Sequence, residues 1–257
     1  MSTRLQLPTN ADIDLLMSRI KGILFPDVFG VVDEDDLRVQ LNQYVRFAVE
    51  ASGTGSSLSS GEGLEIELPL AEIGDLLRQD IQAAADNDPA ATSTLEVMCC
   101  YPAFTAMLHY RVAHALYQLD VPLLPRIITE RAHSITGIDI HPAAQIGPAF
   151  GIDHGTGIVI GATSIIGSHV MVYQGVTLGA KHFARDAEGH MIDQPRHPIL
   201  EDYVTVYSNT SLLGRIRIGH HSVIGGNLWI THDVPPYSQV RQSRPVKKIS
   251  FENGDGI

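Results

Sequence analysis

The chain contains only two cysteines, Cys99 and Cys100, and they are neighbours. Adjacent thiols cannot form the disulfide framework of a small secreted protein, so we expect two buried thiols without a redox or metal role. The sequence also lacks an apolar run of roughly 18 residues, as a membrane span needs, and the basic-then-apolar start of a secretory signal. These absences predict a cytoplasmic protein with no membrane association.

Basic residues are also few: 18 Lys and Arg stand against 29 Asp and Glu, giving a net charge of −11. Because a nucleic acid requires a basic face, we expect no nucleic-acid partner. The imbalance is uneven. Residues 1–100 hold six basic and seventeen acidic residues, whereas residues 203–250 hold six basic residues and one acidic residue, Asp233. The C-terminal region therefore suits a small anionic ligand.

The first half has the apolar spacing of helices. Apolar residues three and four positions apart predict helices over 10–24, 34–50, 68–86 and 102–119. The Gly- and Ser-rich stretch 52–63 has too little apolar surface to order itself and is predicted to be a flexible linker. Together these features predict a helical N-terminal domain over residues 1–136.

After Gly137 the period changes to six. Aliphatic residues recur at this step, with one two-residue phase shift between Ile158 and Ile160. Such a period fits neither a helix nor a flat strand, but it fits a three-faced coil in which each aliphatic residue points into a shared core. We therefore predict a parallel β-helix over residues 137–235. The fourteen core positions are Ile140, Ile146, Ile152, Ile158, Ile160, Ile166, Val172, Leu178, Leu200, Val206, Leu212, Ile218, Ile224 and Ile230.

Residues 180–198 interrupt this repeat. The stretch is polar, carries three histidines and lacks the six-residue period, so it must leave the coil as a loop. Loops that leave a rigid scaffold often carry function, and this one is a candidate wall of an active site. Residues 236–257 follow the coil as a C-terminal segment and tail.

Several strings within the coil resemble one enzyme family. They are DIHPAAQIG from Asp139, DHGTG from Asp153, VTLGAKH from Val176 and RHP from Arg196, joined by DNDPA around Asp88 and YPAFTAMLHYRVAHALY from Tyr101. Together they resemble the serine O-acetyltransferases of bacteria and plants, within the hexapeptide-repeat acyltransferase superfamily. The resemblance implies an α+β fold with a left-handed β-helix, and transfer of acetyl from acetyl-CoA to L-serine in cysteine biosynthesis.

The resemblance implies His154 as the general base and Asp139 as the carboxylate that orients it. An alkyl hydroxyl is a weak nucleophile at neutral pH, so a base must remove its proton as it attacks the thioester. The two residues are fifteen positions apart, close to one turn of a three-faced coil, so we expect them on neighbouring rungs. Without the resemblance, His154 is equally well explained as a structural histidine at a corner of the coil. The string DIHP, which contains Asp139, is equally an ordinary polar start of the first coil.

Serine carries an ammonium and a carboxylate, so its pocket needs both signs of charge. The family match implies that Asp88 and Asp153 hold the amino group, and that Arg196 and His197 hold the carboxylate. Asp before Pro is also an everyday helix stop, which is the alternative for Asp88. The family match further implies feedback inhibition by L-cysteine in the same pocket.

For acetyl-CoA, the resemblance points to Gly179 and Ala180, and then to Ser208 and Gly226 on successive coils. Small residues at tight corners are the structural alternative for each. Lys247, just past the coil, is our candidate for a phosphate contact. No metal is expected.

The C-terminal Ile257 matches the terminal isoleucine of family members that bind cysteine synthase (O-acetylserine sulfhydrylase). A terminal carboxylate on a branched residue can be captured by backbone donors in a partner's active site. Family members also assemble as trimers, or as dimers of trimers, with active sites between subunits. The sequence leaves both assemblies open.

Three other interpretations remain. The chain could acetylate homoserine or another hydroxyl, or it could be a non-catalytic β-helix partner of cysteine synthase. A zinc enzyme would need converging histidines, for which His154, His182 and His197 are candidates. The long loop 180–198 also departs from the shorter Gly-rich loop common in the family, as does VRQSRPVKK after the coil.

Overall fold

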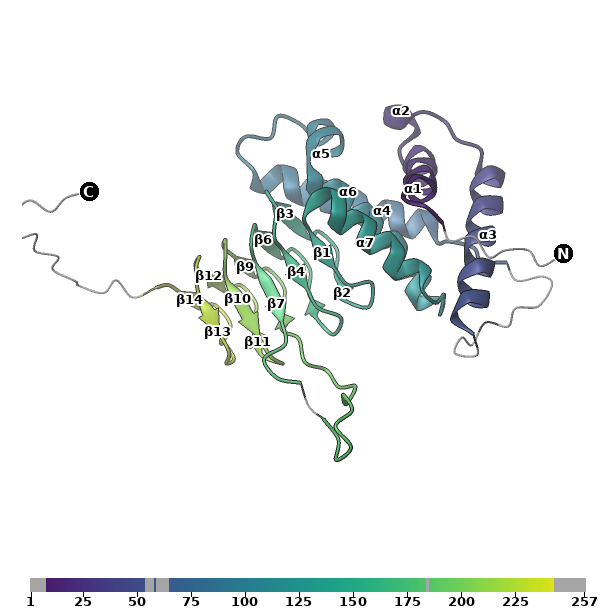
Figure 1. The fold of residues 1–257 in the computed structure, drawn as a ribbon. Coiled ribbons are helices and arrows are strands. Elements are labelled where there is room, and N and C mark those ends of the chain that lie inside the picture. Colours follow the sequence, from purple (N-terminus) through teal and green to yellow (C-terminus); the bar gives the residue numbers. More distant parts are fainter. Residues whose placement is uncertain (1–7, 54–57, 59–64, 184, 243–257) are drawn as a thin grey trace, which may run out of the picture.

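The computed structural model describes residues 8–53, 58, 65–183 and 185–242. Helices from the N-terminal half pack against one end of a coil of short parallel strands (Figure 1). This arrangement is the predicted fold class, a helical N-terminal region followed by a left-handed parallel β-helix. Within the described residues, no helix combines the length and apolar character required to cross a bilayer.

All four predicted helices are present: α1 (Asn10–Leu24), α3 (Glu34–Ser52), α4 (Leu70–Asn87) and α6 (Pro102–Gln118). Three more were not predicted: α2 (Pro26–Phe29), α5 (Thr94–Cys100) and α7 (Leu124–Thr136). The predicted linker 52–63 lies largely outside the described residues.

The helix ends follow local chemistry. Thr9 begins α1 with a capping box, in which its side chain accepts from the Asp12 backbone and the Asp12 carboxylate accepts from Thr9. Helix α4 ends where Asp88 precedes Pro89, as expected for a residue that proline keeps out of the helical region. Cys99 and Cys100 end α5 and are both exposed, so the prediction of buried thiols is wrong. This short helix buries only Val97.

Among the described residues, fourteen short strands form the three faces of the coil. One face has the order β1-β4-β7-β10-β13, the second β11-β8-β5-β2, and the third β14-β12-β9-β6-β3. The strands are β1 (Asp139–Ile140), β2 (Gln145–Ile146), β3 (Gly151–Asp153), β4 (Val159–Ile160), β5 (Ile165–Ile166), β6 (Met171–Tyr173), β7 (Thr177–Gly179), β8 (Ile199–Leu200), β9 (Thr205–Val206), β10 (Ser211–Leu213), β11 (Arg217–Ile218), β12 (Val223–Ile224), β13 (Trp229–Ile230) and β14 (Gln239–Val240).

Every one of the fourteen predicted core positions is buried. In the strands of the β1-β4-β7-β10-β13 face an outward residue precedes an inward aliphatic residue, and the inward residues stack from rung to rung. The pairing of β12 with β14 continues the coil to Val240, past residue 235.

The first turn of the coil is longer than the second. Asp139 pairs with Val159, a turn of 20 residues, whereas Val159 pairs with Thr177, a turn of 18. The extra residues lie in one corner, because five residues separate Asp153 from Val159 but three separate the partners Tyr173 and Thr177. This insertion explains the phase shift in the sequence, and its additional residues include His154.

The register corrects one expectation. Asp139 lies beside Val159 on the next rung, so the prediction that Asp139 and His154 stack on neighbouring rungs is wrong. Asp139 and His154 are fifteen residues apart, whereas the enlarged corner lengthens the first turn of the coil to 20 residues. The separation of Asp139 and His154 in the sequence therefore does not show that they lie together.

The loop 180–198 leaves the coil between β7 and β8, as predicted, and projects from its side (Figure 1). Within it, Arg185 and Met191 form an isolated antiparallel bridge, and the Arg185 guanidinium donates to the Gly189 carbonyl at 2.6 Å. The loop rejoins the coil at Arg196 and His197, whose backbone N–H groups both donate to the Thr163 hydroxyl.

Candidate active site

His154 occupies the enlarged corner between β3 and β4. Its φ of 56° lies in the left-handed region, and the following Gly155 has a φ of 85°. A side chain on Gly155 would also overlap Ile138, because an added Cβ would lie 2.5 Å from that side chain. The corner turns the His154 ring outward: its side chain is 72% exposed, and its Nε2 lies 3.9 Å from Asp153 Oδ1.

Asp88 and Tyr101 lie near this corner. The Tyr101 hydroxyl donates to the Asp88 carboxylate at 2.5 Å, and the Ala90 N–H donates to it at 2.8 Å. The Tyr101 hydrogen bond lowers the pKa of Asp88, as does the nearby charge of His154. The bond to Asp88 in turn raises the pKa of Tyr101 to about 12, so the phenol stays a donor. We call Asp88, Tyr101, Asp153 and His154 the His154 group.

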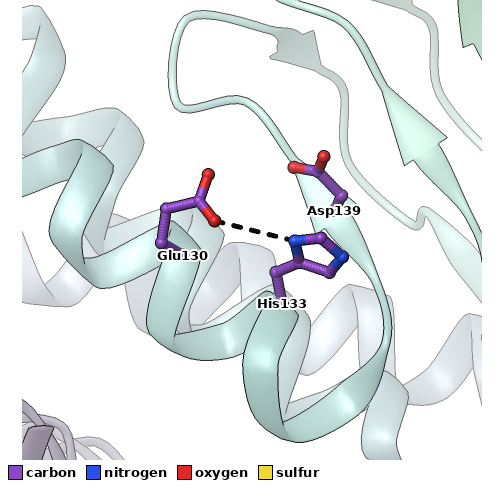
Figure 2. Close-up of side chains that lie close together, drawn as sticks. All are labelled: Glu130, His133 and Asp139. Atoms are coloured by element: carbon purple, nitrogen blue, oxygen red, sulfur yellow. Dashed lines mark ion pairs between the residues drawn. The ribbon is translucent and has the colours of Figure 1, made fainter.

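Asp139 lies elsewhere, at the start of β1 and close to α7. Figure 2 shows its carboxylate facing Glu130 and His133, and one ligand-type atom from each of the three lies within 4.8 Å of the others. Glu130 also pairs with His133 at 3.6 Å and with Arg126. Two of these three side chains are exposed, and no other such cluster occurs among the described residues.

Arg196 and His197 are anchored to the coil through Thr163. The Thr163 hydroxyl accepts from the backbone N–H of Arg196 at 2.9 Å and of His197 at 3.0 Å. The Thr163 N–H donates back to His197 Nδ1 at 3.1 Å. The His197 ring covers Gly161 so closely that a Cβ there would lie 2.0 Å from the ring.

Burial lowers the pKa of His197 to about 4, with a further contribution from the charge of Arg196. At neutral pH the ring is therefore uncharged, and Arg196 supplies the positive charge here. Burial also lowers the pKa of His141, and the charges of Arg126, Asp139 and Arg196 all act on that ring. We call Asp139, His141, Arg196 and His197 the Asp139 group.

The two groups lie apart in one chain. The His154 group sits at the corner that leads into the β1-β4-β7-β10-β13 sheet, whereas Arg196 and His197 sit at the corner where the strands of this sheet end. The structure therefore brings Asp88 and Asp153 to His154, but does not bring Arg196 or His197 to it. The candidate zinc histidines His154 and His197 are separated in the same way.

The candidate acetyl-CoA residues divide between the same two corners. Gly179 ends β7 and Ala180 follows it, on the side of Arg196. Ser208 and Gly226 precede β10 and β13, on the side of His154, and Gly226 is close enough to Ser208 that a Cβ would lie 3.0 Å from its carbonyl oxygen. Lys247 and Ile257 lie outside the described residues.

Beneath the loop 180–198 is a pocket of about 270 Å³. Its described lining includes four basic side chains and no carboxylate, and it extends along the coil as far as Thr231. The basic residues are Lys181, His182, Arg196 and Arg215. Such a lining suits a phosphate-bearing ligand.

No role in the site was expected from the sequence for Tyr101 or Thr163. Tyr101 begins a string that resembles the family, but nothing in the string indicates its bond to Asp88. Thr163 is an ordinary polar residue of the repeat. Its role depends on a loop that returns from more than thirty residues away.

Known proteins resemble this chain over most of its length. A serine acetyltransferase of Synechococcus elongatus, described as plasmid-borne, is 42% identical over 98% of this chain and 86% of its own. The serine acetyltransferase of Mycobacterium tuberculosis is 43% identical over 64% of this chain and 68% of its own. No family model matches the chain.

Solved structures of serine acetyltransferases are also similar to this chain. Serine acetyltransferase isoform 3 of Entamoeba histolytica, in complex with cysteine, has a TM-score of 0.73 and 35% identity, and covers 93% of this chain and 84% of its own. The Neisseria gonorrhoeae serine acetyltransferase, in complex with serine, has a TM-score of 0.64 and 25% identity, and covers 91% of this chain and 82% of its own. By its sequence and its fold, the chain belongs to the serine acetyltransferase family of acyltransferase enzymes.

Proposed function

We propose that the chain transfers the acetyl group of acetyl-CoA to the hydroxyl of L-serine, giving O-acetyl-L-serine and CoA for cysteine biosynthesis. The observation that carries this proposal is the position of His154, exposed on an inserted corner 3.9 Å from the carboxylate of Asp153 and near Asp88. The serine bound by the related Neisseria gonorrhoeae enzyme supports this acceptor.

In the proposed reaction the His154 imidazole removes the serine hydroxyl proton as the oxygen attacks the thioester carbonyl. The tetrahedral intermediate then collapses, the C–S bond breaks, and the imidazolium returns the proton to the departing thiolate. Asp139 orients the ring and stabilises its charged form. Each proton and electron pair is accounted for without a metal or redox partner.

We place the complete site between two copies of the chain. The His154 group of one copy would meet the Asp139 group of the next, because each carries half of the expected residues: His154 lies at the corner that enters the β1-β4-β7-β10-β13 sheet, and Arg196 lies at the corner that leaves it. This arrangement gives serine the carboxylates of Asp88 and Asp153 for its ammonium, and Arg196 with a neutral His197 for its carboxylate. A trimer closes the arrangement, and a dimer of trimers would preserve it.

The same junction provides the groove for acetyl-CoA. Ser208 and Gly226 would line it from the copy that supplies His154, and Gly179 and Ala180 from the copy that supplies Asp139. We further propose Lys247 as a phosphate contact. Because CoA phosphates carry negative charge, the basic pocket beneath the loop 180–198 is compatible with this course.

L-Cysteine differs from serine only in sulfur for oxygen, so we propose that it competes for the same pocket. The cysteine bound to the Entamoeba histolytica relative supports this view. We also propose that Ile257 docks into cysteine synthase. A chain shortened by Ile257 should lose co-purification with cysteine synthase while retaining acetyl transfer.

The proposed reaction is tested by thiol release from acetyl-CoA with L-serine, L-homoserine or no acceptor, using the natural chain and His154→Ala. Serine-dependent release that collapses in the variant supports both the acceptor and the base. Release with homoserine instead would reassign the substrate. A chain that transfers acetyl to neither would support the non-catalytic alternative.

Assembly of the site between copies has its own test. His154→Ala and Arg196→Ala should each be inactive alone, but co-expressed chains should form some sites with both natural residues. With random mixing, about a quarter of the sites in a trimer would be intact. A mixture as inactive as either variant, despite demonstrated mixed trimers, would place both residues in one chain's site.

A further inference from the structure

We propose that Trp229 is the stacking platform for the adenine ring of acetyl-CoA. This inference rests on the proposed function, since it assumes that the thioester lies at His154 and Asp139. Trp229 is the only tryptophan of the chain, and it is 73% exposed. The aromatic face of Trp229 is therefore open for stacking on a ligand ring.

Trp229 stands in line with Asp139 on one face of the coil. Successive partners in the β1-β4-β7-β10-β13 sheet place these outward residues in one column: Asp139, Val159, Thr177, Ser211 and Trp229. The inward neighbour of each is buried. The column therefore runs along the outer face of this sheet, with Asp139 at one end and Trp229 at the other.

The length of this column matches the co-substrate. Four strand spacings separate Asp139 from Trp229, which is about 19 Å at the usual interstrand distance. From ordinary bond lengths, the extended pantetheine arm and pyrophosphate of CoA span roughly 20 Å. A thioester held at Asp139 therefore places the adenine near Trp229 when the arm follows the coil.

The chemistry beside Trp229 also fits the adenosine end of CoA. Thr231, two residues along on the same side of the chain, lines the basic pocket that contains Lys181, His182 and Arg215. The adenosine end carries both a pyrophosphate and a 3′-phosphate. An aromatic face next to a cluster of cations is the combination that such a ligand requires.

A comparison of two acetyl donors distinguishes adenine stacking by Trp229 from a purely structural role of this residue. Acetyl-CoA contains the adenosine, whereas acetyl-pantetheine contains the same thioester without it. We expect Trp229→Ala to raise the KM for acetyl-CoA about 10-fold and to leave the KM for acetyl-pantetheine unchanged. Trp229→Phe, which keeps an aromatic face, should remain close to the natural chain.

A matched control is Tyr237→Ala. Tyr237 is likewise exposed, at 70%, but it belongs to a different corner of the coil, where it contacts His220 and His221. Its loss should change neither KM. Light scattering on each variant establishes that the assembly is unchanged.

Fluorescence gives a second readout, because Trp229 is the only tryptophan. CoA should change its emission saturably, pantetheine should not, and His154→Ala should respond to CoA like the natural chain. Three results would overturn the inference. In Trp229→Ala, the KM for both donors could rise equally, or the KM for acetyl-CoA could stay unchanged. In the natural chain, tryptophan emission could stay constant at saturating CoA. Serine-dependent transfer from acetyl-pantetheine by the natural chain tests the proposed function separately.

Discussion

Asp80 on α4 and Arg111 on α6 form a buried ion pair that ties two helices to the first turn of the coil. Both arms of the guanidinium reach the carboxylate at 3.0 Å, and both side chains are less than 5% exposed. Arg111 also donates to the carbonyls of Ile146 and Gly147, and Asp80 accepts from the Phe150 N–H. Because Asp88 directly follows the last residue of α4, this pair also holds a candidate substrate ligand against the coil.

We expect Arg111→Ala to destabilise the protein by about 3–5 kcal/mol, because it leaves a buried carboxylate without its partner. Urea unfolding measures the change. Arg131→Ala provides the control, since its pair with Asp14 is partly exposed and should be worth at most about 1 kcal/mol. Similar losses in the two variants would mean that the buried pair contributes little.

Deleting His154 and Gly155 should give a folded but inactive protein. The deletion shortens the first corner to the length of the next one, where three residues join β6 to β7. We expect the melting temperature to stay within about 5 °C of the natural value while acetyl transfer is abolished. A chain that no longer folds would show that the insertion also stabilises the coil.

Tyr101→Phe should weaken serine binding without changing the chemical step. The hydroxyl of Tyr101 holds Asp88 in place at 2.5 Å, and the phenylalanine removes this bond. We expect the KM for serine to rise about 3- to 10-fold and kcat to stay constant. Tyr117→Phe, at an exposed position on helix α6, which Tyr101 precedes, is the control. A fall in kcat alone would argue against a binding role for Asp88.

His197 should make stability depend on pH. Its folded pKa of about 4 lies below the ordinary 6.5, so the unfolded chain binds a proton that the folded chain does not. The contribution of His197 to the free energy of unfolding is therefore fully present above pH 6.5. It is lost as the pH falls toward 4, by up to about 3 kcal/mol.

Urea unfolding of the natural chain and of His197→Gln across this range measures the effect. The variant should lose less stability between pH 6.5 and pH 4, whatever its stability at neutral pH. His182→Gln, on the exposed part of the loop 180–198, should behave as the natural chain does. If the free energy of unfolding fell equally with pH in all three proteins, His197 would not be the source of the pH dependence.

Sequence periodicity alone located the coil. An aliphatic residue at every sixth position has one physical solution here, a three-faced coil that buries each of them, and all fourteen are buried. The phase shift between Ile158 and Ile160 likewise marked the enlarged corner. Helices α5 and α7 were not predicted from the sequence; α5 has only seven residues, and α7 has thirteen.

What the sequence determined was therefore local: the repeat, the main helices and the identity of the candidate residues. Their mutual placement was decided by tertiary structure. The enlarged corner and the returning loop divide the residues between two corners, with Asp139 near α7 and His154 near Asp88. Sequence spacing measures length along the chain, whereas the register of the strands and the docking of helices on the coil set distance in space.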